Sequence, residues 1–228
     1  MGYTHPGDEH GLQPVFAQRE SVIDLLDRWQ DRKRLGPAVQ SLLQEIEKSP
    51  WCVSACYLFD IMGRTWTEDT HTHIIAWLLK PWEAHGLRDR FLREFARRGA
   101  GKPLPNGRVR DVVCDKPIGR NNGKIDIEVR GDGWILAVEN KVLHVETPGQ
   151  IEKYDRYYQA RQAMGEKVSA AFLTLNGVRA QAGKLFRPMK YRTVREILEG
   201  CQADAAVPAC EFINTFVEHI RRDLEVSE

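Results

Sequence analysis

The stretch KIDIEVRGDGWILAVENK, residues 124–141, decides the fold because it reads as two strands joined by a tight turn. In its first part Ile125, Ile127 and Val129 alternate with polar residues, so we expect these three side chains on one face of a strand. The segment GDG predicts a hairpin turn. The second part opens with the apolar run WILAV, which predicts a buried strand, and it ends in the charged sequence ENK.

Helices and strands are expected on both sides of this hairpin. Apolar residues at helical spacing predict helices over much of the first 98 residues, and glycine and proline interrupt them. Further strands are expected at 108–115, 168–175 and near 189–192, and further helices at 147–163, 193–200 and 208–224. This order predicts an α/β fold with a restriction-endonuclease-like core, in which helices flank a mixed central β-sheet, and with an N-terminal helical region.

The length of 228 residues fits one large domain better than two. The first residues are rich in glycine, proline and histidine, so we expect a flexible arm there. The expected layout is an arm (1–14) followed by a single domain (15–228), with a helical part (15–98), a core (105–176) and a helical tail (193–226).

Composition sets limits on compartment and partners. The net charge is +1, so no global field attracts the chain to nucleic acid, and only a local basic surface could do so. No apolar run approaches the ~20 residues of a membrane span, and no secretory signal is expected. Five scattered cysteines without a CxxC motif argue against a disulfide framework or a zinc site and favour a reducing cytoplasm. Cys52 and Cys56, four residues apart, are small buried residues or, alternatively, redox or metal groups.

The charged end of the second strand is the first candidate for chemistry. A hairpin brings Asp126 near Glu139, and Lys141 points to the same face as Glu139. Two carboxylates with backbone carbonyls and waters suit Mg²⁺ or Mn²⁺. The lysine could orient or deprotonate a water and neutralise phosphate charge. A plain carboxylate–lysine salt bridge on a solvated sheet face is the alternative.

Two flanking helices carry polar side chains that a core would not need. Gln150, Tyr154, Tyr157 and Arg161 share one helix face and could line a groove for nucleic acid, or form a half-buried aromatic stripe. In the earlier segment EDTHTH, Glu68 and His71 share a face. First-turn acids are also explained by helix capping, although capping does not explain the histidines.

Several of these segments, in the same order, resemble the PD-(D/E)XK nuclease superfamily. The matching stretches are GKIDIEV, ILAVENKV and GQIEKY, preceded by a helix of the form E-x-x-H-[ST]…WLL-x-P and by His85-Gly86. They resemble the divergent branch called PDDEXK-like family 4, and the Q-x-x-x-Y helix is similar to that of RecB-type and λ-exonuclease-like nucleases. The resemblance covers roughly residues 55–175. It departs at the name-giving proline, which is Ile125 here.

The resemblance implies a role for each matching residue. The implied metal ligands are two strand carboxylates, a helix residue and a backbone carbonyl: Asp126, Glu139, Glu68 or His71, and Asn140. The implied cofactor is Mg²⁺ (or Mn²⁺). Lys141 is implied as the catalytic lysine, and Gln150 and Tyr154 would order the metal site or hold the substrate phosphate. A second metal, if one binds, would sit nearer Glu68.

The function expected from this resemblance is metal-dependent hydrolysis of phosphodiester bonds in nucleic acid, with DNA favoured over RNA. Tyr157 and Arg161 are expected nucleic-acid contacts, and the arginine-rich 88–98 helix allows further backbone contact. The alternatives are a nuclease-fold protein that binds nucleic acid or protein without cutting, and a hydrolase of another ester with a small-molecule pocket. A homodimer is compatible with the sequence, and no membrane partner is expected.

Overall fold

The computed structural model describes residues 59, 62–119, 123–143, 147–181 and 183–225, all within one compact unit that spans residues 54–228. The expected arm at 1–14 and the expected helical pattern at 15–48 lie outside the described residues. The expected helix at 51–63 lies outside them as well, except for Phe59 and two residues at its end. The prediction that 15–228 forms a single domain therefore stays a prediction.

A five-stranded mixed sheet forms the centre of the described unit, with strand order β1-β2-β3-β4-β5. The strands are β1 Val109–Pro117, β2 Lys124–Gly131, β3 Trp134–Lys141, β4 Lys167–Thr174 and β5 Phe186–Lys190. The pairs β1–β2 and β2–β3 are antiparallel, and the pairs β3–β4 and β4–β5 are parallel. The β2–β3 hairpin closes on the pair Gly131–Trp134, and Gly133 at φ +75° supplies the left-handed turn residue. The predicted hairpin and the mixed sheet are confirmed.

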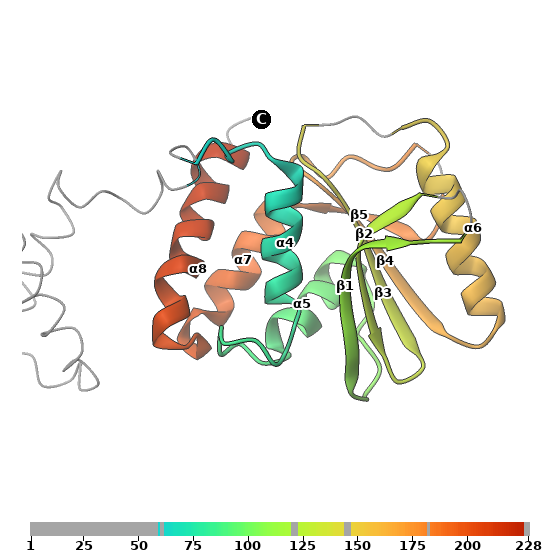
Figure 1. The fold of residues 1–228 in the computed structure, drawn as a ribbon, viewed down its shortest axis with the longest axis horizontal. Helices are drawn as coiled ribbons and strands as arrows, with labels where there is room; N and C mark the ends of the chain where they lie inside the picture. Colours follow the sequence, from blue (N-terminus) through green and yellow to red (C-terminus); the bar gives the residue numbers. More distant parts are fainter. Residues whose placement is uncertain (1–58, 60–61, 120–122, 144–146, 182, 226–228) are drawn as a thin grey trace, which may run out of the picture. The chain divides into compact units, whose positions relative to one another are not determined.

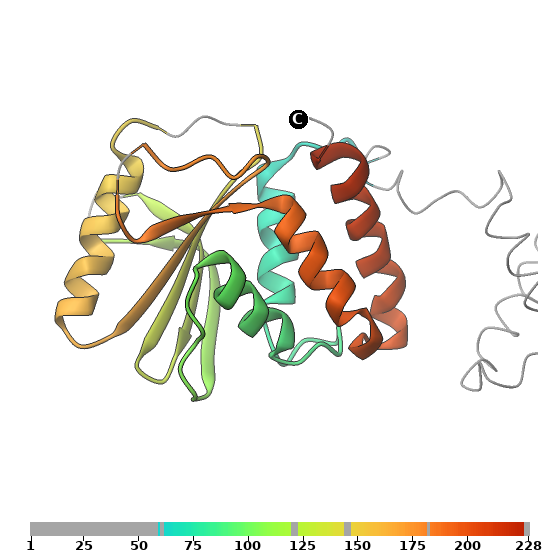
Figure 2. The same cartoon turned by 180° about the vertical axis from the view of Figure 1, so that it is seen from behind.

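Helices cover both faces of the sheet (Figures 1 and 2). They are α4 Glu68–Leu78, α5 Arg90–Gly99, α6 Gln150–Ala163, α7 Tyr191–Cys201 and α8 Val207–His219, with short turns at Gln202–Asp204 and Ile220–Leu224. Helix α6 lies alone against one face, and the other four helices lie on the opposite side. The predicted α/β class, with helices flanking the sheet, is therefore confirmed. Among the described helices, none is long and apolar enough to cross a membrane.

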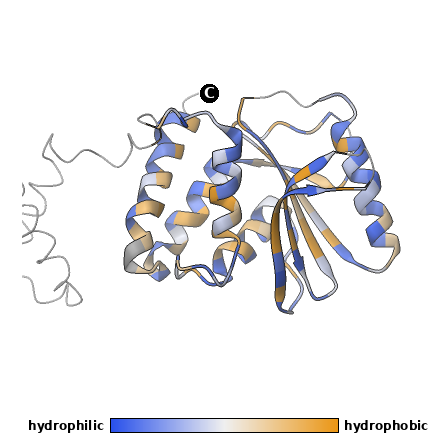
Figure 3. Ribbon diagram, viewed as in Figure 1, coloured by the Kyte–Doolittle hydropathy of each residue, from blue (hydrophilic) through white to orange (hydrophobic). Residues whose placement is uncertain are grey.

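Apolar residues, orange in Figure 3, recur along the strands and the helices, and many of their side chains are buried between the sheet and the helices. They form two buried clusters: a large one with α4, α5, α7 and α8, and a smaller one under α6. A charged group lies beside the smaller cluster: Glu128 is only 1% exposed and contacts Tyr158, a member of that cluster. Its carboxylate accepts hydrogen bonds from Tyr158 Oη at 2.9 Å and from Arg130 Nε at 2.6 Å, so this buried charge is paired.

Strand β2 does not keep one regular face along its whole length. Ile127 and Val129 belong to the large cluster, but Ile125 belongs to the cluster under α6. The prediction that all three share a face is therefore wrong for Ile125. The physical reason is that β2 parts from β3: their ladder ends at the pair Ile127–Val138, whereas β2 stays paired with β1 down to Lys124. A pattern with a period of two assumes a regular strand, and this strand changes direction at Asp126.

Candidate metal centre

Asp126 lies where β2 and β3 separate. Beyond the last ladder pair, its Oδ2 accepts a hydrogen bond from the backbone N–H of Asn140 at 2.6 Å. The carboxylate thus replaces a strand carbonyl as the acceptor and keeps the end of β3 beside β2. The fork between the strands also leaves the Asp126 carboxylate partly exposed, next to the buried end of β3.

Glu139 is the most deeply buried carboxylate of the group, with no exposed surface. Its Oε1 accepts from Lys141 Nζ, which lies 2.9 Å away, and from Gln150 Nε2 at 2.8 Å. Its Oε2 is buried and has no hydrogen-bond partner among the described residues. A buried polar oxygen without a partner is costly unless a cation or a water fills the space beside it.

Lys141 joins two carboxylates that come from different parts of the chain. Besides Glu139, its Nζ lies 3.1 Å from Glu68 Oε1, in the first turn of α4. The other oxygen, Glu68 Oε2, accepts from the backbone N–H of Val142 at 3.1 Å. Glu68 therefore ties the start of α4 to the end of β3, and together with Glu139 it holds the lysine ammonium.

Burial and mutual repulsion raise the pKa values of the two strand carboxylates, Asp126 and Glu139. Burial, opposed in part by the Asn140 N–H and Lys141, raises the pKa of Asp126 from 3.8 to about 6. Burial and the neighbouring Asp126 charge raise the pKa of Glu139 from 4.5 to about 8. For Lys141, burial alone would lower the pKa, but the charge of Glu139 and the other carboxylates raise it above its ordinary value. Among the described residues, the carboxylates of Asp126, Glu139 and Glu68 meet one ammonium group, that of Lys141, so acidic side chains outnumber basic ones at the site.

Gln150 and Tyr154 complete the α6 side of the site. Gln150 Nε2 donates to Glu139 Oε1 and also to Tyr154 Oη, both at 2.8 Å. Tyr154 Oη in turn donates to the backbone carbonyl of Lys124 at 2.6 Å, at the start of β2. The Q-x-x-x-Y pair thus connects the Glu139 carboxylate with the strand that carries Asp126. Of the two roles that the resemblance implied, these contacts favour ordering of the metal site.

The side chain of Asn140 points to the opposite layer of the molecule. Its Nδ2 donates to Thr72 Oγ1 at 3.0 Å, and its Oδ1 accepts from Tyr191 Oη at 2.7 Å. All three residues are buried. This network holds β3 between α4 and α7 and fixes the direction of the strand at the site. The sequence did not point to Tyr191, because no local motif marks it. Metal binding by the Asn140 backbone carbonyl stays a prediction.

The structure does not bring His71 to the carboxylates. Its Nδ1 lies 2.7 Å from the Thr67 carbonyl and its Nε2 lies 2.8 Å from His219 Nε2. Burial lowers the pKa of His71 to about 4, so the ring is neutral near pH 7. With both ring nitrogens facing protein partners, His71 packs in the helical layer, and Glu68 is the α4 residue that reaches the site.

Tyr157 and Arg161 lie farther along α6. The Tyr157 ring packs edge-on against Tyr158 with 5.0 Å between ring centroids. The guanidinium of Arg161 pairs with Glu166, with Nη2 at 2.7 Å from Oε1. Neither makes a hydrogen bond to the carboxylate site among the described residues. Their contact with nucleic acid stays a prediction.

The residues present fit a divalent cation with few protein ligands. Among the described residues, no group of three His, Cys, Asp or Glu side chains converges on one point. Mg²⁺ needs only one or two carboxylates, because it keeps several of its waters. Asp126 and Glu139 supply those carboxylates, and the partnerless Glu139 Oε2 is an acceptor that a cation would satisfy.

The fold and this site define a restriction-endonuclease-like α/β protein. The family model described as the PD-(D/E)XK nuclease superfamily, PDDEXK_4, matches residues 58–223. The chain therefore belongs to the PD-(D/E)XK nuclease superfamily. No curated protein and no solved structure matches the chain.

A pH-dependent response to metal follows from the raised acid pKa values. Both folded-state pKa values lie above the ordinary ones, so these acids begin to ionise in the unfolded chain at a lower pH than in the folded protein. The metal-free protein therefore loses stability as pH rises from about 4 to about 8. Bound Mg²⁺ relieves that cost. At ~100-fold excess over Kd, Mg²⁺ should raise the Tm of the protein only slightly near pH 5.5 and by about 5–10 °C near pH 8. Thermal unfolding of the full chain with Mg²⁺ or with EDTA measures this gain.

The matched variant for that measurement is Glu139→Gln, which removes the charge but keeps the shape of the side chain. It should unfold at a higher temperature than the wild type in EDTA near pH 8 and should show no gain with Mg²⁺. If Mg²⁺ raised the Tm equally at all pH values, or raised the Tm of Glu139→Gln as much as that of the wild type, the metal would bind elsewhere.

Proposed function

We propose that this protein is a metal-dependent nuclease that hydrolyses phosphodiester bonds of nucleic acid, with DNA favoured over RNA. The observation that carries the proposal is the buried, partnerless Glu139 Oε2 beside Asp126 and Lys141. A salt bridge to Glu139 alone would explain the position of Lys141. It does not explain why the second oxygen of Glu139, Oε2, is buried without a hydrogen-bond donor. The family membership supports the same reading, since it supplies the class of reaction.

Mg²⁺ or Mn²⁺ is the proposed cofactor, held by Asp126 and Glu139. When bound there, the cation would polarise the attacking water and offset charge on the phosphate. Glu68 is proposed to act through Lys141, because its two oxygens contact Lys141 Nζ and the Val142 N–H. Gln150 donates to Glu139 Oε1, so Oε2 stays available as the oxygen that would bind the cation.

Lys141 is proposed to act as a fixed positive charge. Its raised pKa keeps the ammonium group protonated near neutral pH, which favours donation to a phosphate oxygen over removal of a proton from water. Its two carboxylate neighbours hold Nζ at 2.9 and 3.1 Å, so the donor is already placed before substrate arrives. Of the two roles weighed for this lysine, neutralising phosphate charge is thus the better supported.

The arginine-rich helix α5 contributes less to substrate binding than its sequence suggests. Its arginines pair with nearby acids: Arg90 with Asp204, Arg93 with Asp89, Arg97 with Glu94, and Arg98 with Glu196. A paired guanidinium offers a phosphate much less net charge. Arg161 of α6 is paired with Glu166 in the same way, so ion pairing does not separate the two helices. Tyr157 and Arg161 remain proposed nucleic-acid contacts because they continue the helix face of Gln150 and Tyr154.

Cleavage assays on the purified full chain test the proposal. Single-stranded DNA, duplex DNA and RNA of matched sequence should be incubated with Mg²⁺, with Mn²⁺ and with EDTA. We expect DNA cleavage with either cation and none in EDTA. DNA binding without cleavage under every condition would instead support the catalytically silent binding module.

The remaining proposals concern the oligomeric state and the cellular compartment of the protein. The described cysteines are free, which fits a reducing cytoplasm. A homodimer remains a proposal that sedimentation of the purified chain would test.

A further inference from the structure

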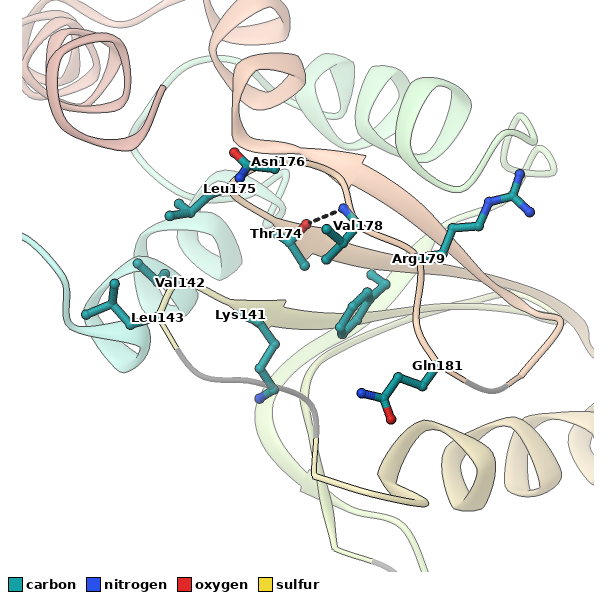
Figure 4. Close-up of a pocket in the computed structure, with 10 residues that line it drawn as sticks. Lys141, Val142, Leu143, Thr174, Leu175, Asn176, Val178, Arg179 and Gln181 are labelled. Atoms are coloured by element: carbon teal, nitrogen blue, oxygen red, sulfur yellow. Dashed lines mark hydrogen bonds between the residues drawn. The ribbon is translucent and has the colours of Figure 1, made fainter. Parts of the chain in front are cut away.

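A recess of about 360 Å³ opens beside Lys141, at the ends of β3 and β4 (Figure 4). Its floor includes Phe172 and Thr174, which are buried. One wall is the segment after β3, with Val142 and Leu143, and the other is the loop after β4. Such a volume lies at the lower end of small-ligand sites, which run from about 300 to 1,000 Å³, so it suits one nucleotide and not a duplex.

Both walls present large apolar side chains to solvent. Leu143 is 60% exposed and Val178 is 57% exposed, and both line the recess. Single exposed apolar residues are ordinary, but these two line one recess, where a ligand could cover both of them. A nucleobase has the flat apolar faces that would cover them.

Polar groups lie around the same recess. Lys141 enters it from β3, and the side chain of Gln181 extends toward the same space from the opposite loop (Figure 4). Arg179 lies at the outer rim, and among the described residues it makes no ion pair. The Lys141 ammonium at the inner end and the Arg179 guanidinium at the outer rim each offer a positive charge to a backbone phosphate.

Hydrogen bonds hold both flanks of the loop wall. At its start, Thr174 Oγ1 accepts from the Val178 N–H at 3.0 Å. At its end, the buried Asp155 of α6 accepts from the backbone N–H groups of Lys184 at 3.0 Å and Leu185 at 2.8 Å. A preformed wall costs less ordering on binding than a mobile one.

We propose that this recess binds an unpaired nucleotide of the DNA strand, directly beside the phosphodiester that the enzyme cuts. Its position carries this assignment, because Lys141 belongs both to the recess and to the Glu139 ion pair. A base inside a duplex is stacked on both faces and cannot enter such a recess without leaving the stack. The substrate class is then single-stranded DNA, or duplex ends and flaps with unpaired bases. This inference rests on the proposed nuclease function.

Binding in EDTA tests the recess without requiring cleavage. The probes are a fluorescein-labelled oligodeoxythymidylate of roughly 12 nucleotides, within the size range of single-strand sites, and a labelled blunt duplex of equal length. The variant Val178→Trp fills the recess from an exposed position, and Leu143→Asp removes its apolar wall. Each should weaken binding of the single strand by about tenfold or more, the effect of losing one stacking contact. Duplex affinity should stay within about twofold.

Two arginine variants test whether the rim of the recess contacts the DNA strand. Arg179→Ala should also weaken single-strand binding, whereas Arg108→Ala, at an exposed arginine near the β2–β3 turn, should leave it unchanged. Unchanged single-strand affinity in Val178→Trp and Leu143→Asp would overturn the inference, as would an equal loss for the duplex. If the wild type cleaves duplex DNA and these variants cleave it as well, the nuclease proposal survives and the inference fails. If binding depends on the recess but no DNA is cut with metal, the inference survives and the nuclease proposal fails.

Discussion

Replacing Asp126 with asparagine should abolish Mg²⁺-dependent DNA cleavage, with a loss of about 1,000-fold or more. The amide oxygen can still accept the hydrogen bond from the Asn140 N–H, now 2.6 Å from Oδ2, so the end of β3 should stay in place. What is lost is the negative charge beside Glu139, which the proposed cation requires. Single-turnover cleavage of a labelled oligonucleotide measures the effect, and circular dichroism checks the fold.

Asp111→Asn is the matched control for this variant. Asp111 is exposed on the neighbouring strand β1, so loss of its charge should leave cleavage unchanged. Asp126→Asn should also lose the Mg²⁺-induced gain in Tm near pH 8. Wild-type cleavage by a correctly folded Asp126→Asn protein would remove Asp126 from the active site.

Replacing Lys141 with methionine should lower cleavage by about 100- to 1,000-fold while metal binding persists. The change removes a donor held between Glu139 and Glu68 but leaves both carboxylates in place. Since one positive charge disappears, the remaining acids should hold Mg²⁺ at least as tightly as before. The Mg²⁺ gain in Tm should therefore be retained or increased, in contrast to Asp126→Asn.

A lysine at the other end of the sheet serves as the control for Lys141. Lys167→Met, at the exposed start of β4, should cleave DNA as the wild type does. If Lys141→Met lost both cleavage and the metal response, Lys141 would be needed to build the site and not only to act on phosphate.

Local sequence patterns were enough to predict the centre of the site. The alternation in β2, the GDG turn and the apolar run of β3 are all short-range features, and the hairpin they predict brings Asp126 next to Glu139 and Lys141. Helical spacing in α6 also predicts that Gln150 and Tyr154 share a face, and they are hydrogen-bonded at 2.8 Å.

Other features depend on contacts between distant segments, which a single sequence does not reveal. Tyr191 supports Asn140 across 51 positions, and His71 meets His219 across 148. The change of face at Ile125 arises because β2 leaves β3, and hydropathy alternation carries no sign of such a bend. The recess beside Lys141 likewise depends on how the loop after β4 is anchored to α6 by Asp155.

The most direct test of the central claim is anomalous scattering from a crystal of the full chain soaked in MnCl₂. A Mn²⁺ peak is expected between the carboxylates of Asp126 and Glu139, roughly 2.1 Å from Glu139 Oε2. The same peak should be missing from crystals of Glu139→Gln. A crystal of protein with Mn²⁺-dependent cleavage in solution, but with its only manganese peaks away from these two carboxylates, would contradict the account.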